Sequence, residues 1–208
     1  MNILGVGAHF DDLELGCSGT LINHVEKGDT VIMLVVTNSA YHDENGKLVR
    51  SAEDAMQEGI HAAELIGARM ICLEYATFEV PFNEDLTSKI HKVINDNKID
   101  AIYSHWIHDI HRDHEFVGRC TLMAGRHVPR FLMYRSNHYD SIQAFPGNIY
   151  SDISGVMERK IEVIKAHRSE LERVRYAWVD FFTHQNQNDG QKIGVEYAEA
   201  FEAIRYRI

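Results

Sequence analysis

The stretch NILGVGAHFDD, residues 2–12, joins a short apolar run directly to a histidine and two adjacent aspartates. The run at 2–7 is short and rich in β-forming residues, so we expect a strand that ends just before His9. Carboxylates as close as those of Asp11 and Asp12 repel each other unless a positive charge lies among them. The sequence therefore predicts a bound cation at the end of the first strand.

Further β-type runs alternate along the chain with patterns in which apolar residues recur three or four apart, as in helices. We expect strands at residues 2–7, 30–37, 69–74, 100–104 and 130–135, and helices near 17–28, 51–67, 85–97 and 113–125. Gly28 and Gly67 stand where helix C-caps would lie. Alternation of this kind predicts an α/β fold, in which helices cover both faces of a mostly parallel sheet.

The rest of the chain is more polar or less regular. Residues 38–50 and 136–150 are expected to be loops at the rim of a site. The tail contains two stretches that we expect to be helical, 155–182 and 194–206, separated by the polar run THQNQNDGQK. No internal repeat and no linker rich in Pro, Gly or Ser divides the chain, so we expect a single domain over residues 1–208.

Composition excludes several classes of function. The chain has 208 residues, of which 45% are hydrophobic, enough to bury the core of one domain. A net charge of −10 argues against a nucleic acid or an anionic membrane as partner. The three cysteines are far apart and lack CxxC spacing, which argues against disulfides and cysteine zinc sites. Neither a signal peptide nor a membrane span is evident, so we expect a cytoplasmic location without stable membrane insertion.

A second group of histidines and acids follows the fourth predicted strand, in SHWIHDIHRDHE at residues 104–115. We expect the first and fourth strands to lie side by side at the point where the strand order reverses, because ligands bind there in such sheets. The two segments would then converge at one edge. Zinc binds imidazole nitrogen and carboxylate oxygen, and a catalytic zinc keeps one position open. A divalent metal therefore explains both segments together.

Both segments resemble motifs of the LmbE-like, PIG-L-type metal-dependent deacetylases. AHFDDLELGCSGTL at 8–21 is similar to the family signature AHPDD-x-ELG-x-GG, and DIHRDH at 109–114 is similar to DxHxDH. Segments at 151–154, 166–171 and 194–201, with Lys160, resemble C-terminal patterns of members that act on sugars. The resemblance runs from residue 3 to about 201. It implies a Rossmann-like three-layer fold, usually with zinc, that hydrolyses N-acetyl groups of amino sugars and their conjugates.

The resemblance also implies residue roles. The implied metal ligands are His9, Asp12 and His114. Asp11 would be the general base, His111 would stabilise the oxyanion or protonate the leaving amine, and Asp113 would orient His111. Zinc is the expected ion, although ferrous iron or cobalt suits the same two-histidine, one-carboxylate set. These roles agree with the chemistry, since amide hydrolysis needs an activated water and a proton delivered to nitrogen.

Several residues near the motifs have open roles. His105 follows the fourth strand directly and is expected either to line the pocket or to be structural, and His108 has no motif position. His167 matches a family position but is equally compatible with helix packing. Asp109 is expected behind the metal ligands, and Glu14 is expected to brace a loop or a helix N-terminus.

Other positions concern the substrate or depart from the family pattern. Phe10 replaces the usual proline, Glu170 replaces a commoner glutamine, and residues 76–80 lack an aspartate that many members carry. The last two departures concern substrate contacts rather than the metal. Candidates for holding a phosphate or carboxylate of the substrate are Arg50, Arg135 and Arg168.

Three functions remain compatible with the sequence: a zinc hydrolase that deacetylates an amino sugar or its conjugate, the same site acting on a non-sugar amide, and a non-catalytic metal- or sugar-binding module. The presence of Asp11 and His111 argues against the third, because binding alone requires neither. A homo-oligomer, either a trimer or a hexamer, is also expected, because the family often assembles through its C-terminal helices. The apolar side chains of that tail are Trp178, Phe181, Phe182, Tyr197 and Phe201.

Overall fold

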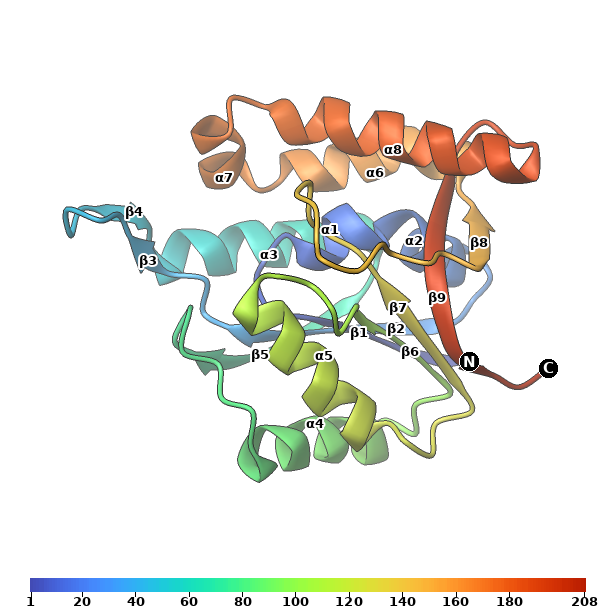
Figure 1. Ribbon diagram of the computed structural model, residues 1–208, viewed down its shortest axis with the longest axis horizontal. Helices are drawn as coiled ribbons and strands as arrows, with labels where there is room; N and C mark the ends of the chain where they lie inside the picture. Colours follow the sequence, from blue (N-terminus) through green and yellow to red (C-terminus); the bar gives the residue numbers. More distant parts are fainter.

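A computed structural model describes residues 1–208, and its centre is a seven-stranded sheet (Figure 1). The strand order is β5-β2-β1-β6-β7-β9-β8. The strands are β1 (Asn2–Gly7), β2 (Thr30–Thr37), β5 (Arg69–Tyr75), β6 (Ala101–His105), β7 (Arg130–Tyr134), β8 (Ile149–Asp152) and β9 (Ala198–Tyr206). The first five in chain order are parallel, whereas β9 runs antiparallel to both β7 and β8. The predicted α/β fold with a mostly parallel sheet is confirmed.

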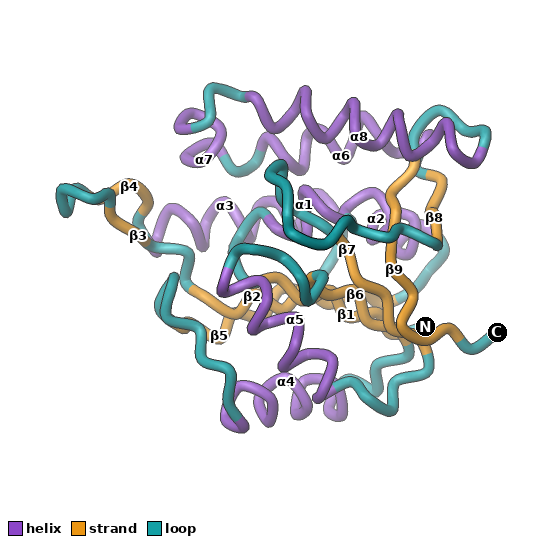
Figure 2. The backbone as a smooth tube through the Cα atoms, in the orientation of Figure 1, coloured by secondary structure: helices purple, strands orange, loops and turns teal.

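Helices lie on both sides of this sheet (Figure 2). They are α1 (Asp12–Gly16), α2 (Ser18–Glu26), α3 (Ala52–Ile66), α4 (Glu84–Asp96), α5 (Arg112–Ala124), α6 (Met157–Lys165), α7 (Arg168–Arg173) and α8 (Ala177–Ile193). Helices α4 and α5 cover one face, whereas α1, α2, α3 and α6 cover the other. Leu171 of α7 and Trp178 and Phe182 of α8 pack on Ile164 of α6, outside that layer.

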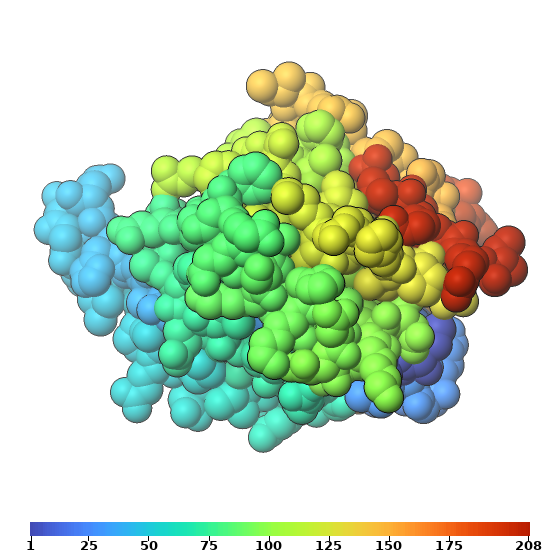
Figure 3. Space-filling model, turned by 90° about the horizontal axis from the view of Figure 1, so that it is seen from below, coloured from blue at the N-terminus to red at the C-terminus, as the bar shows by residue number.

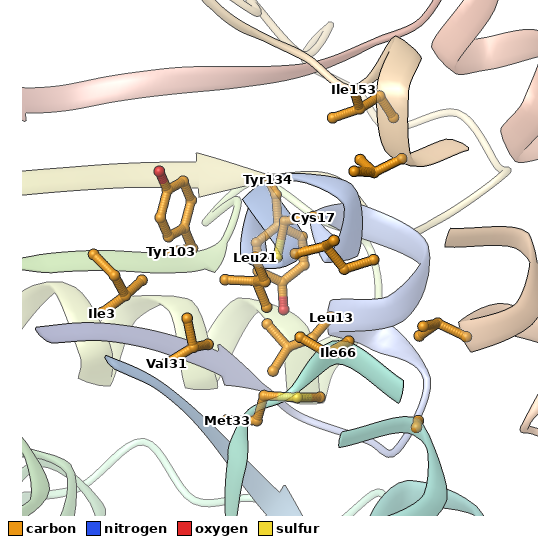
Figure 4. Close-up of a cluster of buried hydrophobic side chains, with 14 of the residues drawn as sticks. Ile3, Leu13, Cys17, Leu21, Val31, Met33, Ile66, Tyr103, Tyr134 and Ile153 are labelled. Atoms are coloured by element: carbon orange, nitrogen blue, oxygen red, sulfur yellow. The ribbon is translucent and has the colours of Figure 1, made fainter. Parts of the chain in front are cut away.

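The alternation of side chains along the central strands explains the two apolar layers. In β1, Ile3 packs into the cluster under α1–α3, and the next residue, Leu4, packs into the cluster over α4 and α5. Figure 4 shows the first cluster, in which Leu13 and Leu21 point toward Val31 and Met33 of β2. A parallel strand buried on both faces must be apolar at successive positions, as this one is.

The predicted parallel strands and the helices between them form within two residues of their expected bounds. Local capping explains the helix limits. The side chain of Ser51 accepts a hydrogen bond from the N–H of Asp54 at the start of α3, and Gly67 ends that helix with φ of 86°. The helix predicted near 17–28 is preceded by the short α1, which the sequence pattern did not predict.

The prediction of a helix at 194–206 is wrong, because this segment contains strand β9. Ala and Glu favour helix locally, but the open edge of β7 offers backbone partners to this segment. The Glu199 side chain fixes the strand, since it accepts hydrogen bonds from the N–H groups of Gly19 and Thr20 on α2. Tertiary contacts therefore override local propensity.

The predicted helical stretch 155–182 is also divided differently in the structure. It contains a short 3₁₀ turn (Ser154–Val156), α6, α7 and the start of α8. The polar run 183–192, predicted to separate two helices, lies inside α8. Its polar side chains have partners there: Asn186 donates to the carbonyl of Ala198, and Asp189 accepts from Arg135 and Lys192. Buried polar contacts replace the apolar periodicity that marks most helices.

The expected polar loop at 38–50 contains a small hairpin of β3 (Tyr41–His42) and β4 (Leu48–Arg50). Figure 3 shows it projecting from the body of the molecule in light blue. Its base carries Tyr41 and Arg50, whose side chains reach the cavity described below. None of the helices combines the length and apolar character needed to cross a bilayer.

Candidate active site

The two motif segments meet where β1 and β6 end. These strands are parallel neighbours, with Val6 opposite Ser104, so the loops that follow them leave the same edge of the sheet. His9 lies in the first loop, and Asp12 is the first residue of α1. His114 lies in the first turn of α5, after the second loop. The expected convergence is therefore present in the structure.

The three implied metal ligands present their donor atoms to one another. His9 Nδ1 lies 3.2 Å from His114 Nε2 and 3.4 Å from Asp12 Oδ2, and His114 Nε2 lies 3.1 Å from Asp12 Oδ1. Zinc at 2.0–2.1 Å from each of four tetrahedral ligands would separate neighbouring donor atoms by about 3.3 Å. The donor set and its spacing therefore fit a divalent ion.

The same region contains two other groups of three possible donors, each within 4.8 Å and both including His114: His9 with His111, and Asp12 with His105. The His105 ring is fully buried behind the site and stacks on His114 at 4.1 Å between centroids. Its Nε2 contacts Asp12 Oδ2 and the N–H of Ala8, both at 3.0 Å, and it does not line the cavity. His105 thus supports Asp12 from behind.

Residues at the end of β7 support the same ligands. Ser136 donates from Oγ to Asp12 Oδ1 at 3.1 Å. Asp109 Oδ2 lies 3.1 Å from His114 Nδ1, and the Asn137 amide donates to the Asp109 carboxylate. Asp109 therefore lies behind His114, one of the implied ligands, as expected. The sequence analysis missed Ser136 and Asn137, which belong to no motif and follow a different strand.

The buried carboxylates favour positive charge on His9 and His114, the two histidines of the implied ligand set. Burial lowers the pKa of His9, but Asp113 and Asp12 outweigh it and raise the pKa to about 9. Burial likewise opposes protonation of His114, whereas Asp12 and Asp109 raise its pKa to about 10. His9 Nδ1 and His114 Nε2 face each other at 3.2 Å, so a divalent cation held between them would take the place of a proton.

Asp11 stands beside these ligands in a strained backbone conformation. Its φ is 136°, a positive value that non-glycine residues rarely adopt and that costs about 1–3 kcal/mol. Burial and the charge of Asp12 raise the pKa of the Asp11 carboxyl to about 7, whereas Arg50, 3.6 Å away, opposes the rise. Strain of this kind often accompanies function.

Phe10, which replaces the usual proline, is accommodated by packing. Its ring is 1% exposed and lies on Gly59 of α3, where a Cβ would come within 2.2 Å of it. Its N–H donates to Ser39 Oγ at 2.9 Å, a hydrogen bond that proline lacks. The turn is therefore formed by a different contact.

His111 lines the cavity, but its expected partnership with Asp113 is not present. Asp113 Oδ2 lies 3.1 Å from His9 Nε2 and accepts from the N–H of Phe78, whereas His111 Nδ1 has no hydrogen-bond partner. Burial, with the neighbouring His114 and His9 rings, lowers the pKa of His111 to about 4. In this structure Asp113 contacts His9 instead of His111, so the orienting role of Asp113 stays a prediction.

A cavity of about 420 Å³ opens over these groups. His9, Asp11, Asp12, His111 and His114 all line it, so the sequence-predicted residues share one site except for Asp113. Lining residues that the motifs did not identify include Tyr41, Thr77, Phe78, Ser136, Asn137, Tyr139, Arg173 and Trp178. They come from the β3–β4 hairpin, from loops and from α7 and α8, whose positions no local pattern indicates.

Glu170 and His167 lie on different sides of the cavity wall. Glu170 lines the cavity and accepts from the hydroxyl of Tyr41 at 2.7 Å. His167 is buried and does not line it, with Nδ1 3.2 Å from Arg50 and Nε2 3.1 Å from Glu14. Packing is thus the role that the structure supports for His167, whose Nε2 lies near Glu14 Oε1 without forming a hydrogen bond to it.

The candidate arginines are largely occupied. Arg50 donates to the carbonyl of Phe10 and to Glu58, and Arg135 pairs with Asp189. Arg168 is the first residue of α7 and does not line the cavity. The structure therefore shows no cluster of free cations for a phosphate among these three.

The chain is similar to a known protein family and to individual deacetylases. The family model PIG-L: GlcNAc-PI de-N-acetylase matches residues 4–124, which is more than half of the chain. Diacetylchitobiose deacetylase of Thermococcus kodakarensis is 26% identical over 222 residues, covering 97% of this chain and 82% of that protein. The matched family region includes every residue of the two motifs.

Solved structures share the fold at lower identity. N,N′-diacetylchitobiose deacetylase of Pyrococcus horikoshii is 22% identical with a TM-score of 0.84, over 98% of this chain and 83% of that one. The 4-carboxy-2-hydroxymuconate hydratase of Pseudomonas putida is 17% identical with a TM-score of 0.81, over 100% and 97%. The fold alone therefore does not fix the reaction. From the family match and the two motifs that it covers, we conclude that the chain belongs to the PIG-L family of GlcNAc-PI de-N-acetylases.

Proposed function

We propose that this protein is a metal-dependent hydrolase that removes an N-acetyl group from an amino sugar or an amino-sugar conjugate. One observation carries the proposal: the donor atoms of His9, Asp12 and His114 lie 3.1–3.4 Å apart, with Asp11 beside them in one cavity. A binding module needs the ligands but not the adjacent strained carboxylate. The family match and the deacetylase relatives support the reaction class.

His9, Asp12 and His114 would hold the ion, for which zinc is our first choice and ferrous iron or cobalt the alternatives. When bound, such an ion supplies a Lewis acid and a water of lowered pKa. Asp109 and Ser136 hold two of the ligands in place through the contacts described above. Support of this kind fixes the orientation of the ligands.

The chain's own residues supply the proton transfers. Asp11 takes a proton from the attacking water while the water oxygen bonds to the acetyl carbon. The C–N bond then breaks, the proton passes to the amine nitrogen, and the products are acetate and a free amino sugar. The neutral ring of His111 donates an N–H hydrogen bond to the carbonyl oxygen as charge develops on it, which is how an oxyanion is stabilised. General acid–base help of this kind typically contributes about 100- to 10,000-fold.

The substrate class is supported by the lining of the cavity. Aromatic side chains, hydroxyls and amides converge there, among them Tyr41, Ser136, Asn137 and Trp178. Such a lining offers apolar surface and a few oriented polar groups to a small polar ligand. A non-sugar N-acyl compound in the same site remains the alternative substrate.

Acetate release tests this function. We expect purified protein with one equivalent of zinc to release acetate from N-acetylglucosamine or its β-1,4-linked dimer, and to leave an amine that reacts with fluorescamine. N-acetylated amino acids serve as the non-sugar comparison. Release of acetate only from the latter would favour the alternative, and release from neither class by zinc-, iron- or cobalt-loaded protein would overturn the proposal.

The oligomer and the location stay predictions. Of the tail residues expected at an interface, Trp178, Phe182 and Phe201 are buried within their own chain. Only Phe181 is substantially exposed, at 39%. A trimer or hexamer through this tail would therefore need other contacts as well, and light scattering at micromolar concentration measures the assembly directly.

A further inference from the structure

An aromatic side chain outside both motifs lies against His111. Phe78 belongs to the loop of residues 76–83 between β5 and α4, and it lines the cavity. Its ring stacks on the imidazole of His111, with 5.8 Å between the centroids and 30° between the planes. The separation is within the range of about 4.5–7 Å that aromatic pairs adopt. Phe78 therefore contacts a candidate catalytic residue although it belongs to neither motif.

The backbone of Phe78 has a conformation that is unfavourable for its residue type. Its φ is 67°, in the left-handed region that glycine occupies readily and that a bulky residue rarely adopts. The N–H of Phe78 donates to Asp113 Oδ2 at 2.7 Å, and its carbonyl accepts from the guanidinium of Arg112. Both partners directly follow His111 in the chain. The strained loop is therefore fixed to the segment that carries His111.

A second aromatic contact restrains the same ring. The ring of Tyr41 meets Phe78 edge-on, with 6.1 Å between the centroids. Tyr41 is itself anchored, because its hydroxyl donates to Glu170 at 2.7 Å. Although Phe78 is 46% exposed, its ring is therefore held between the β3–β4 hairpin and the start of α5.

His111 lacks the hydrogen bond that commonly orients a catalytic imidazole. Its Nδ1 is buried without a partner, and Asp113 contacts His9 and the N–H of Phe78 instead. Aromatic rings surround the imidazole: His114 at 4.4 Å, His9 at 4.9 Å and Phe78. His9 and His114 belong to the implied ligand set, which leaves Phe78 as the ring contact from outside the candidate metal site.

We infer that Phe78 is a positioning residue, which holds the imidazole of His111 toward the carbonyl oxygen of the substrate. This inference rests on the proposed function, in which His111 donates a hydrogen bond to that oxygen. Contact with the face of the imidazole orients the ring and leaves the nitrogens at its edge free to bond. Misplacing a catalytic group by about 1 Å can cost about 100-fold in rate. Glycine would satisfy the backbone at this position, so the strained phenylalanine indicates that the ring itself is needed.

The first test measures kcat, KM and metal content of zinc-loaded Phe78→Ala with the β-1,4-linked dimer of N-acetylglucosamine. We expect kcat to fall about 10- to 100-fold with KM within about twofold and the ion retained, because the ring acts through His111. Phe78→Tyr keeps the ring and should restore kcat. Phe82→Ala is the matched control and should keep wild-type kcat. Phe82 lies in the same loop, is 51% exposed, packs on Phe116 and does not line the cavity.

Phe78→Gly separates positioning from folding. Glycine adopts the observed φ without strain, so we expect this variant to unfold at a temperature no lower than that of the wild type. Its kcat should nevertheless fall as in Phe78→Ala. Scanning calorimetry measures the unfolding temperature. A lower unfolding temperature together with wild-type kcat would show that the ring serves the fold alone, and would overturn the inference.

The double variant Phe78→Ala with His111→Ala identifies the group through which Phe78 acts. In the His111→Ala background, removing the Phe78 ring should lower kcat by less than about twofold, because the two residues act as one unit. An equal fall in both backgrounds, or a change confined to KM, would overturn the positioning role while the deacetylase function stands. No acetate from the wild type would instead remove the proposed function, and the positioning role with it.

Discussion

Two groups of buried charge meet at helix α1, and they differ in how completely they are satisfied. At one end, Asp12 stands among His9, His105 and His114 in the candidate metal site. At the other, the carbonyl of Leu15 accepts from Lys160, whose ammonium is 2.6 Å from Glu199. Both groups are buried except for His9, whose side chain is partly exposed. The Lys160–Glu199 pair has hydrogen-bond partners for all its carboxylate oxygens, and we call it the closed group. The candidate metal site retains atoms without partners, and we call it the open group.

The hydrogen-bond partners of the two groups indicate a structural role for the closed group and a ligand-binding role for the open group. Glu199 accepts from Gly19, Thr20 and Lys160, so its carboxylate has protein partners on both oxygens. In the candidate metal site, Asp113 Oδ1 and His111 Nδ1 have no partner, and the surrounding carboxylates raise the pKa of His9 and His114. A buried ion pair whose atoms all have protein partners holds the packed elements in one arrangement. A group that retains unpartnered donor and acceptor atoms can still bind a ligand.

The largest expected effect follows from removing a ligand of the open group. His114→Ala should lower the bound divalent ion from about one per chain to none and abolish acetate release, because two ligands rarely hold zinc. Elemental analysis after gel filtration measures the ion, and circular dichroism checks that the fold is kept. A variant that retains one ion per chain would show that His114 is not a ligand.

Breaking the closed group should act on stability instead. Lys160→Met leaves Glu199 buried without its counter-charge, and we expect about 3–5 kcal/mol less stability in urea unfolding. The double variant Lys160→Met with Glu199→Gln should recover part of this loss, because the stranded charge is gone. Metal binding by the folded fraction should be unchanged. A loss below about 1 kcal/mol, within the range of exposed pairs, would contradict this reading of the pair.

A smaller effect is expected from the residues behind the ligands. Asn137→Ala removes the amide that holds Asp109 against His114, and we expect zinc affinity to fall about 10- to 100-fold. Competition with a chromophoric chelator measures it. Asn45→Ala, in the exposed turn of the β3–β4 hairpin, is the matched control. Equal affinity in Asn137→Ala and wild type would remove Asn137 from the support of the site.

Features encoded by local sequence patterns could be predicted, whereas features that depend on contacts between distant segments could not. The parallel strands and their helices were predicted because each is encoded by a local pattern. The implied ligand set came from the resemblance of two strand-end segments to family motifs, and it stays a prediction. Strand β9 was missed since its state depends on the distant edge of β7 and on Glu199 contacting α2. Ser136, Asn137 and Arg50 were assigned no supporting role because their contacts cross between elements far apart in the chain.

The central claim is that Asp11 performs the proton transfer while His9, Asp12 and His114 hold the ion. The most direct measurement is kcat for Asp11→Asn beside the metal content of the same sample. We expect about one ion per chain and a kcat lower by about 100- to 10,000-fold, because the amide cannot accept the proton. Near-normal turnover with the ion bound would contradict this claim and assign the proton transfer to another group.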